Sequence, residues 1–409
     1  MHSNELFSRE RLAGYDPECL ATSVALVVGA GALGQNTAQN LALAGVGEIR
    51  LVDRDLFEDH NRTRSPAYPL PEEKASYGLS KARAVAHKLK RLMTAPRPVM
   101  RYAHQWIQQL GDGAFRGVSV VVCCVDTPSG RAYLADKSRL HGIALIEGGF
   151  NGSQISLSCY PAALGEEAQT APCWQCANQD LVGAFSCRFY ASLAEEAGII
   201  PAIQNAAGTL AGLQAEAAIL AIHGQPIGAT KFIAFDLNLR TLKTQSIRLA
   251  TDPLCPGLHC SLAESPVRLE TSTEDTVEHL LQEIGDRWNR AATLKIDPPL
   301  IWTAPCARCG VMTFVRSRDW LWMMSPHCGA CGGGYSVVDS EASGRSATIY
   351  VELSLETDVQ ALRSTCGEVG LPPLSLVEAR SDSGQSKLFE LAGTLNEIFE
   401  QGDDNDQWN

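Results

Sequence analysis

Three glycines follow the first buried strand that the sequence predicts, and their spacing suits phosphate binding. The apolar run 24–28 is short and rich in valine, as expected of a strand buried on both faces. The GxGxxG glycines come next: Gly29, Gly31 and Gly34. A second apolar run, 49–52, ends on Asp53, about 20 residues after the glycines, where an acid can hold a ribose hydroxyl. This order predicts a nucleotide-binding βαβ unit rather than an accidental glycine-rich turn.

Cationic and polar side chains follow the second strand. The loop 57–71 carries Asn61 and Arg64. A helix is expected over 79–92, with Lys81 in its first turn, where a cation opposes the helix dipole unless an anion lies nearby. The conflict points to phosphate binding, whereas the plainer interpretation of the loop is a solvated basic surface.

Asp126 ends a further apolar run, 118–125. Ligands gather at the carboxyl ends of strands in open α/β sheets, although the residue could also cap the next helix. A dinucleotide dehydrogenase has no use for such a set of cations beside the phosphates, and the chain has no GxxxxGK[ST] P-loop. The set therefore indicates ATP held by a Rossmann-type turn, with fixed cations and Mg²⁺ stabilising the charge on the phosphates.

The segment 53–64 carries a family resemblance. It reads DRDLFEDHNRTR and resembles the DxDxVExSNLxRQ signature of the ThiF/MoeB/ubiquitin-activating-enzyme superfamily. The match departs from that signature at four positions: Phe57, His60, Arg62 and Ser65. Three further segments are similar to family motifs. Residues 6–10 resemble the RYSRQ opening, 78–82 the GxxKA segment and 126–131 the DNxxxR segment. The resemblance covers roughly residues 5–262.

The resemblance implies a function and roles for these residues. The three glycines would cradle ATP, Asp53 would hold the ribose, and Asp55 would also belong to the nucleotide-binding residues. The phosphate contacts would be Asn61, Arg64 and Lys81. Asp126 would hold Mg²⁺, and Arg9 would reach the γ-phosphate of a partner protomer, since adenylation units of the family are dimers. The implied reaction is adenylation of the C-terminal carboxylate of a small ubiquitin-like, β-grasp protein.

Two sets of cysteines have metal-ligand spacing. One set has two C-x2-C pairs with 18 residues between them, as in zinc ribbons: Cys306, Cys309, Cys328 and Cys331. The other combines Cys173 and Cys176 with a later pair, Cys255 and Cys260, where the resemblance places the second zinc pair of the family. Because the later pair is spaced C-x4-C, His259 is an alternative fourth ligand. Both sites are expected to be structural Zn²⁺ sites.

Cys187 is the candidate nucleophile. It follows the first cysteine pair in the segment where the family keeps its reactive cysteine, and the neighbouring Arg188 would favour the thiolate. The alternative is an ordinary half-buried cysteine, since several family members only adenylate.

The composition restricts the class of protein. The chain has 409 residues and a formal net charge of -12, which argues against nucleic acid as a partner. No run approaches the ~18 apolar residues of a membrane span. The start of the chain lacks the apolar core of a signal peptide, which favours a cytoplasmic protein in which 14 cysteines serve metal sites and reactive thiols.

The expected fold is α/β: a Rossmann-like adenylation domain with a mixed sheet over 1–264, including a crossover loop at about 162–204. A C-terminal α+β domain over 265–409 would contain a zinc ribbon at 302–336 and a short disordered tail. Within this frame we expect helices over 205–223 and 273–288, an antiparallel strand pair at 231–237 and 244–249, and strand, helix and strand over 343–380.

Several functions remain open at this level. The leading interpretation is an activating enzyme that passes the adenylated protein to Cys187 as a thioester and then to a conjugating enzyme, with the C-terminal region recruiting the partner. The first alternative is adenylation for thiocarboxylate formation on a sulfur carrier, as in thiamine or molybdopterin synthesis or tRNA thiolation. A non-catalytic ATP-binding scaffold and an NAD-dependent oxidoreductase are the other two.

Overall fold

The computed structural model describes residues 6–68, 80–178, 203–227, 233–262, 264–306, 308–318, 328–333 and 347–402. The chain divides into two units. The first comprises Met1–Ile107, Ala114–Ala263 and Phe399–Asn409, and the second comprises Gln108–Gly113 and Glu264–Ile398. The main division falls between Ala263 and Glu264, and two short segments belong to the unit on the other side of it. Residues 108–113 belong to the second unit, and the described end of the chain, 399–402, returns to the first.

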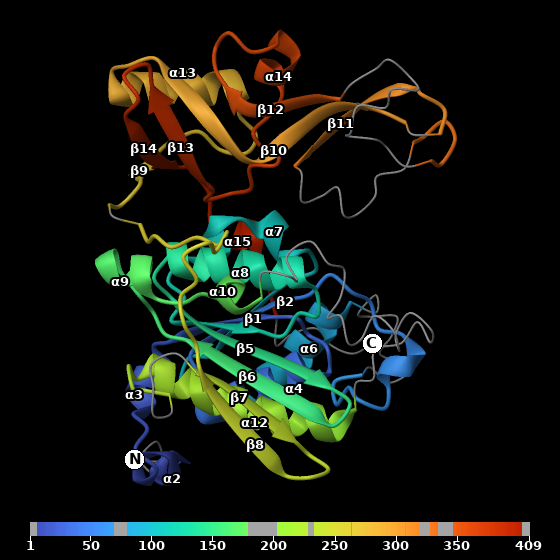
Figure 1. The fold of residues 1–409 in the computed structure, drawn as a ribbon, viewed down its shortest axis with the longest axis vertical. Helices are drawn as coiled ribbons and strands as arrows, with labels where there is room; N and C mark the ends of the chain where they lie inside the picture. Colours follow the sequence, from blue (N-terminus) through green and yellow to red (C-terminus); the bar gives the residue numbers. More distant parts are fainter. Residues whose placement is uncertain are drawn as a thin grey trace. The chain divides into compact units, whose positions relative to one another are not determined.

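The first unit is organised around a mixed sheet, in which the described residues form nine strands in the order β15-β3-β2-β1-β4-β5-β6-β7-β8. Strands β3, β2, β1, β4 and β5 run parallel, and β6, β7 and β8 continue as antiparallel neighbours (Figure 1). The strands are β1 Val24–Val28, β2 Glu48–Val52, β3 Val99–Ala103, β4 Val120–Cys123, β5 Ala144–Asn151, β6 Gln154–Tyr160, β7 Ile233–Asn238, β8 Lys243–Arg248 and β15 Glu400–Gln401.

Helices cover both faces of this sheet. Helices α4 (Ala32–Ala44) and α12 (Gln204–Ile222) lie on one face, and α8 (Pro128–Leu140) lies on the other (Figure 1). Helix α6 (Lys81–Lys90) packs against β3 and α4. The shorter helices of the unit are α2 Ser8–Leu12, α3 Pro17–Ala21, the 3-10 turn η1 Asp59–Asn61, α9 Gly165–Thr170 and α10 Trp174–Ala177. The short helices α7 (Ile107–Leu110) and η2 (Asp112–Phe115) occur where the chain passes from one unit to the other.

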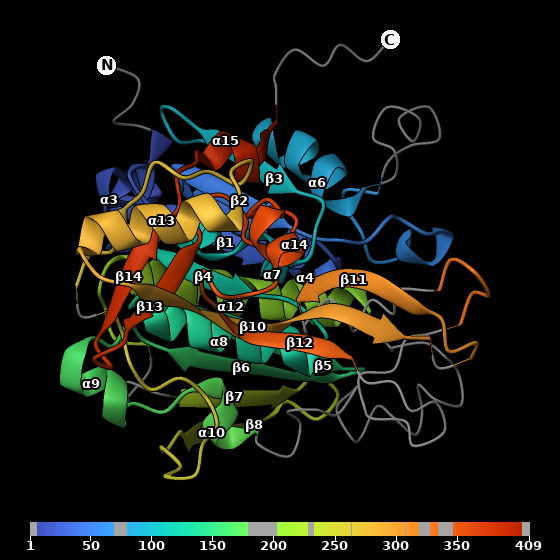
Figure 2. The ribbon, with the colours of Figure 1, turned by 90° about the horizontal axis from the view of Figure 1, so that it is seen from above.

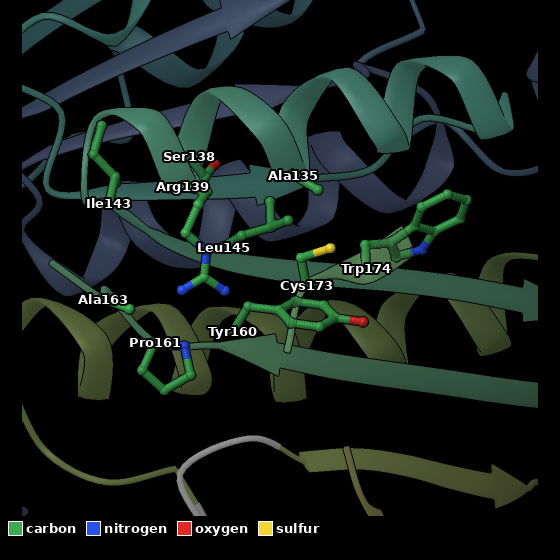
Figure 3. Close-up of a pocket in the computed structure, with 10 residues that line it drawn as sticks. All are labelled: Ala135, Ser138, Arg139, Ile143, Leu145, Tyr160, Pro161, Ala163, Cys173 and Trp174. Atoms are coloured by element: carbon green, nitrogen blue, oxygen red, sulfur yellow. The ribbon is translucent and has the colours of Figure 1, made fainter. Parts of the chain in front are cut away.

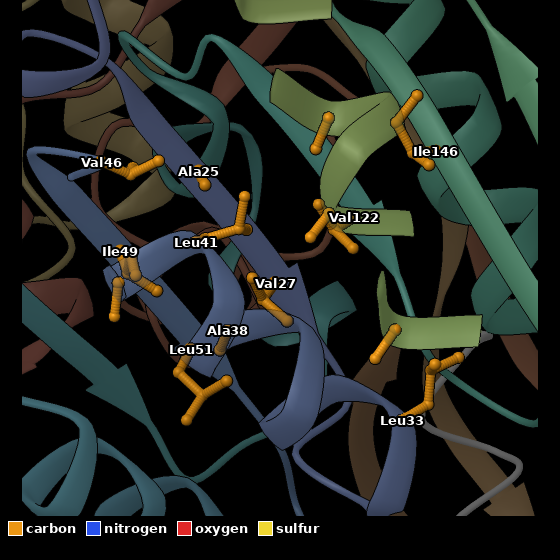
Figure 4. Close-up of a cluster of buried hydrophobic side chains, with 14 of the residues drawn as sticks. Ala25, Val27, Leu33, Ala38, Leu41, Val46, Ile49, Leu51, Val122 and Ile146 are labelled. Carbon is orange, nitrogen blue, oxygen red and sulfur yellow. The ribbon is translucent and has the colours of Figure 1, made fainter. Parts of the chain in front are cut away.

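The main core lies between the first strands and α4. Val27 of β1, Leu51 of β2 and Leu41 of α4 are fully buried and point into one cluster (Figure 4). Helix α4 ends at Gly45, which adopts the left-handed backbone conformation (φ 97°) that glycine favours. This packing fixes α4 against β1, and the glycine turn connects the two elements.

The second unit has its own six-stranded sheet and core in the described residues. The order is β11-β10-β13-β14-β9, with β12 also paired to β10. The strands are β9 Val267–Arg268, β10 Ala292–Pro305, β11 Met312–Arg318, β12 Thr348–Leu353, β13 Leu376–Ser381 and β14 Ser386–Glu390. Helix α13 (Val277–Trp288) contacts β10 and the shorter helix α14 (Val359–Arg363), and α15 spans Leu395–Ile398 (Figure 2). The sequence-based expectation of an α/β domain followed by an α+β region is confirmed.

The elements expected from periodicity agree closely with the structure. The first strand has the expected limits, and the antiparallel pair is found as β7 and β8. Ser80 caps α6 by accepting a hydrogen bond from the backbone N–H of Arg83 (3.4 Å). The expected tail at 403–409 lies outside the described residues, and none of the described helices is long and apolar enough to cross a membrane.

Candidate functional site

The glycine turn joins β1 to α4, and each of its three positions accommodates glycine for a different structural reason. Gly29 has φ 99°, and its N–H donates to the Val52 carbonyl (2.8 Å). A Cβ on Gly34 would lie 1.7 Å from the Gly29 carbonyl oxygen, so the third glycine permits α4 to pack against the turn. A Cβ on Gly31 would meet no atom within 4 Å. Gly31 therefore borders open space at the N-terminus of α4, where a phosphate can approach the backbone.

Asp53 lies at the end of β2 and supports the same turn. Its carboxylate accepts hydrogen bonds from the backbone N–H groups of Ala30 (2.5 Å) and Asp55 (2.7 Å). Burial, together with the charge of Asp55, raises the pKa of Asp53 to about 6. Above that pH the group is an acceptor-only carboxylate suited to ribose hydroxyls, and below it the group is protonated.

Asp55 links Lys81 to Asp53, because Asp55 pairs with the lysine and donates its backbone N–H to Asp53. The Lys81 Nζ is 3.0 Å from Asp55 Oδ2, and the Lys81 backbone N–H donates to the Asp55 carbonyl (3.0 Å). The Lys81 side chain is only 12% exposed. Asp55 therefore supplies the anion that a lysine in the first turn of α6 requires, and phosphates could compete for the same ammonium group.

The segment from Asn61 to Arg64 is held beside the start of α4. Asn61 is buried and accepts a hydrogen bond from the Glu58 N–H (2.9 Å), so its side chain caps the turn η1. Gln35 donates to the Gly31 carbonyl (3.1 Å) and to Ser65 Oγ (3.0 Å). Sequence reasoning missed Gln35, although a glutamine in the first turn after a glycine loop is a usable signal. Arg64 is half-buried in the segment that Gln35 anchors.

Asp126 is exposed just beyond the end of β4, the strand next to β1. Nearby, Arg131 of α8 forms a largely buried ion pair with Glu147 of β5. Gln214 of α12 is fully buried and donates to the carbonyls of Cys123 (3.0 Å) and Ile146 (3.2 Å). This hydrogen-bonded amide joins the carboxyl end of β4 to the first half of β5, and Gln214 is a second supporting residue that the sequence did not reveal.

Arg9 lies away from this edge. It is exposed on α2, and Phe7, two residues before it, lies against Gly45, at the end of α4 opposite the glycine turn. The 13 residues of α4 span about 20 Å at ~1.5 Å per residue. The structure therefore does not bring Arg9 to the nucleotide edge of its own chain. Cys187 lies outside the described residues.

The comparisons with known proteins agree with this geometry. The model of the ThiF family matches residues 10–257. The chain belongs to the ThiF family. This confirms the superfamily resemblance, and the family match ends before Glu264–Ile398, the main part of the second unit.

The curated relatives of this ThiF-family chain are named for two activities, adenylyl transfer and sulfur transfer. The mouse adenylyltransferase and sulfurtransferase MOCS3 is 34% identical over 160 residues, which cover 38% of this chain and 32% of that protein. The adenylyltransferase and sulfurtransferase uba4 of Aspergillus clavatus is 29% identical over 273 residues, covering 64% of this chain and 51% of that protein. The chain thus spans about a third to a half of these relatives.

Among solved structures, E. coli MccB with MccA-N7isoASN has a similar fold. The TM-score is 0.50 at 18% identity, and the match covers 63% of this chain and 75% of that one. At this level of identity the likeness concerns the fold alone.

The first metal-ligand cluster of the ThiF-family unit contains His259. Cys173 Sγ lies 3.6 Å from both Cys255 Sγ and His259 Nε2, and Cys176 Sγ lies 3.5 Å from His259 Nε2. A tetrahedral zinc ion with Zn–S bonds of ~2.3 Å has ligand-to-ligand edges of ~3.8 Å, so the four atoms fit Zn²⁺. The structure places the alternative ligand His259 in the cluster, whereas Cys260 is exposed and outside it. The C-x3-H spacing brings the imidazole back to the thiols.

The second cluster has the four thiols expected from the sequence. Cys306 Sγ lies 3.5 Å from Cys331 Sγ, and Cys309 Sγ lies 3.7 Å from Cys328 Sγ. Each C-x2-C pair is followed by a glycine with left-handed backbone, Gly310 (φ 67°) and Gly332 (φ 68°). These four thiols also fit a closed tetrahedral zinc site, which leaves no ligand position for catalysis.

Removing His259 should separate the two possible ligand sets of the first cluster. We expect His259→Ala to lose one zinc per chain, because a three-thiol site lacks its fourth ligand, while Cys260→Ser keeps both. Metal content after dialysis against a weak chelator, measured by mass spectrometry of the metal, would show this. Loss of zinc from Cys260→Ser with retention in His259→Ala would contradict the assignment.

A small cavity of about 10 Å³ lies beside the first cluster, between α8 and the end of β6. Figure 3 shows Arg139 extending from α8 toward Tyr160 and Pro161, with Cys173 next to it. Small-molecule sites usually occupy ~300–1,000 Å³, so this cavity is not a nucleotide pocket. It does surround a buried guanidinium group that neighbours a metal-ligand cluster.

Proposed function

We propose that this protein adenylates the C-terminal carboxylate of a small ubiquitin-like protein with ATP. The observation that carries the proposal is the arrangement at the carboxyl edge of β1, β2 and β4. There the open glycine turn and an acid lie beside a lysine held by Asp55. Membership of the ThiF family and the names of the curated relatives support the same reaction.

In this proposal the ATP phosphates lie against the glycine turn at the N-terminus of α4. Asp53 and Asp55 face the ribose, while Lys81 exchanges part of its contact with Asp55 for the phosphates. Asn61 and Arg64 lie on the segment that Gln35 holds beside the turn and contribute further phosphate contacts. Asp126 is the residue that would hold Mg²⁺, which neutralises charge on the phosphates when it is bound.

The chemical step needs no general base. A carboxylate oxygen of the protein substrate forms a bond to the α-phosphorus, and the bond from that phosphorus to the bridging oxygen breaks to release pyrophosphate. The nucleophile is already an anion, so positioning and charge neutralisation by Lys81 and Arg64 lower the barrier.

We further propose that the enzyme acts as a homodimer. Arg9 lies at the opposite end of α4 from its own glycine turn, so it can serve the γ-phosphate only in the site of a partner protomer. The main part of the second unit, Glu264–Ile398, lies beyond the family match and would recruit the protein substrate or a conjugating enzyme. Its four-cysteine cluster would bind structural zinc.

An ATP–pyrophosphate exchange assay tests the reaction. We expect exchange that depends on a small β-grasp protein ending in Gly-Gly, and no exchange with the same protein lacking those glycines, because the carboxylate must reach the α-phosphate. ATP binding without exchange for any tested carrier would favour a non-catalytic scaffold. Hydride transfer with a nicotinamide cofactor would instead favour the oxidoreductase alternative.

The fate of the adenylate distinguishes two versions of the proposal. The names of the relatives, which join adenylyltransferase to sulfurtransferase, favour thiocarboxylate formation on a sulfur carrier. Transfer to Cys187 as a thioester is the other version. A thiocarboxylate product identified by mass supports the first, and an adduct on non-reducing gels that Cys187→Ala abolishes supports the second.

A further inference from the structure

Helix α8 presents two charged side chains to the first metal-ligand cluster. Asp136 and Arg139 are three residues apart and therefore lie on one side of the helix. Asp136 Oδ1 accepts hydrogen bonds from the Gln175 side-chain amide (2.8 Å) and from the Leu258 backbone N–H (2.8 Å). Gln175 lies between the two cysteines of the first pair, and Leu258 immediately precedes His259. One carboxylate thus joins the two ligand-bearing segments.

Arg139 holds the chain directly before the first cysteine pair. One of its amino groups, Nη2, donates to the carbonyls of Pro172 (2.7 Å) and Ala171 (3.4 Å). The side chain is buried, at 5% exposure, and its other amino group, Nη1, has no hydrogen-bond partner within the described ranges. Burial lowers the pKa of Arg139, whereas the neighbouring thiols Cys173 and Cys176 and the carboxylate of Glu167 favour its charged form. Burying a charge in this way is costly unless an opposite charge lies nearby.

A metal ion bound at the cluster would keep its three thiols as thiolates, so the whole centre would carry that opposite charge. A divalent ion with three thiolates and one neutral imidazole carries one net negative charge. Figure 3 shows Cys173, one of these thiols, beside Arg139. We propose that Arg139 is the buried counter-cation of a zinc centre formed by Cys173, Cys176, Cys255 and His259, and that Asp136 positions the two segments carrying these ligands. The inference goes beyond the adenylation proposal and rests on the metal assignment of the first cluster.

Zinc release from the full-length protein tests the role of the charge, with the four-cysteine cluster of the second unit as an internal control. Arg139→Gln keeps a hydrogen-bond donor but removes the charge, and Arg139→Lys keeps both. Because residues around the ligands usually change metal affinity about 10–100-fold, we expect Arg139→Gln to release one zinc at least about tenfold faster. Arg139→Lys should remain close to the wild-type rate, and the second zinc should leave at the same rate in all three proteins. A chelating dye that reports free zinc follows both phases.

The outcomes separate this inference from its premises. Equal release rates for Arg139→Gln and Arg139→Lys would overturn the counter-cation role, since the charge would then make no difference. If Arg139→Gln does not accumulate as folded protein, Asp136→Ala provides a second measurement. Faster release from the first cluster alone supports the positioning role, and an unchanged rate overturns it. A wild-type protein that binds no zinc at the first cluster would refute the metal assignment, whatever the result for adenylation.

Discussion

Replacing Gly31 with alanine is expected to weaken ATP binding about 10–100-fold without unfolding the protein, because hydrogen bonds to charged groups are worth about 1.5–3 kcal/mol each. The added methyl group would meet no protein atom within 4 Å, so the fold has no reason to change. It would instead stand at the N-terminus of α4, where the phosphates must approach the backbone. Isothermal titration with ATP and a thermal melt without nucleotide would measure the two effects separately.

Gly34→Ala is the matched comparison, because the same methyl group there should act on stability. Its Cβ would lie 1.7 Å from the backbone oxygen of Gly29, and no flexible side chain can move to relieve that contact. We expect a loss of about 3 kcal/mol or more, hence a melting temperature lower by about 6–12 °C. Unimpaired ATP binding by Gly31→Ala, or an unchanged melting temperature for Gly34→Ala, would contradict this account of the turn.

Replacing Lys81 with methionine should lower ATP–pyrophosphate exchange by about 10²–10³-fold, the usual effect of removing one group that stabilises charge in the transition state. Stability should change little, because the partner carboxylate Asp55 is half exposed and such ion pairs contribute about 0–1 kcal/mol. Exchange kinetics at saturating carrier, with a thermal melt of the same sample, would test both statements.

Lys90→Met serves as the control for Lys81. Lys90 stands at the opposite end of the same helix, where its Nζ donates to the Pro98 carbonyl (2.6 Å) and a cation suits the helix dipole. Its loss should reduce stability slightly and leave exchange at the wild-type level. Equal exchange rates in Lys81→Met and wild type would remove this lysine from the proposed mechanism.

Local patterns determined much of the first unit. Strand β1, the turn after it and the acid at the end of β2 follow from short apolar runs and glycine spacing, which depend only on neighbouring residues. The same holds for the cap of α6, where Ser80 accepts a backbone hydrogen bond. The four thiols of the second cluster could also be predicted from the sequence, because each C-x2-C pair is followed directly by the glycine that forms its turn.

Contacts between distant segments required the tertiary structure. The return of residues 399–402 to pair with β3 leaves no trace in periodicity, because β15 has only two residues. Gln35 and Gln214 are ordinary glutamines until folding buries them beside backbone carbonyls.

The sequence by itself determined the family, the glycine turn, three ligands of the first candidate metal cluster and all four of the second, since these depend on residue types at short, regular spacing. Only the tertiary structure decided between His259 and Cys260, because a tetrahedral site selects the atom that reaches the other ligands. It also brought Asp136 and Arg139 of α8 to that cluster. Such roles depend on distances across the fold, and spacing along the chain does not encode them.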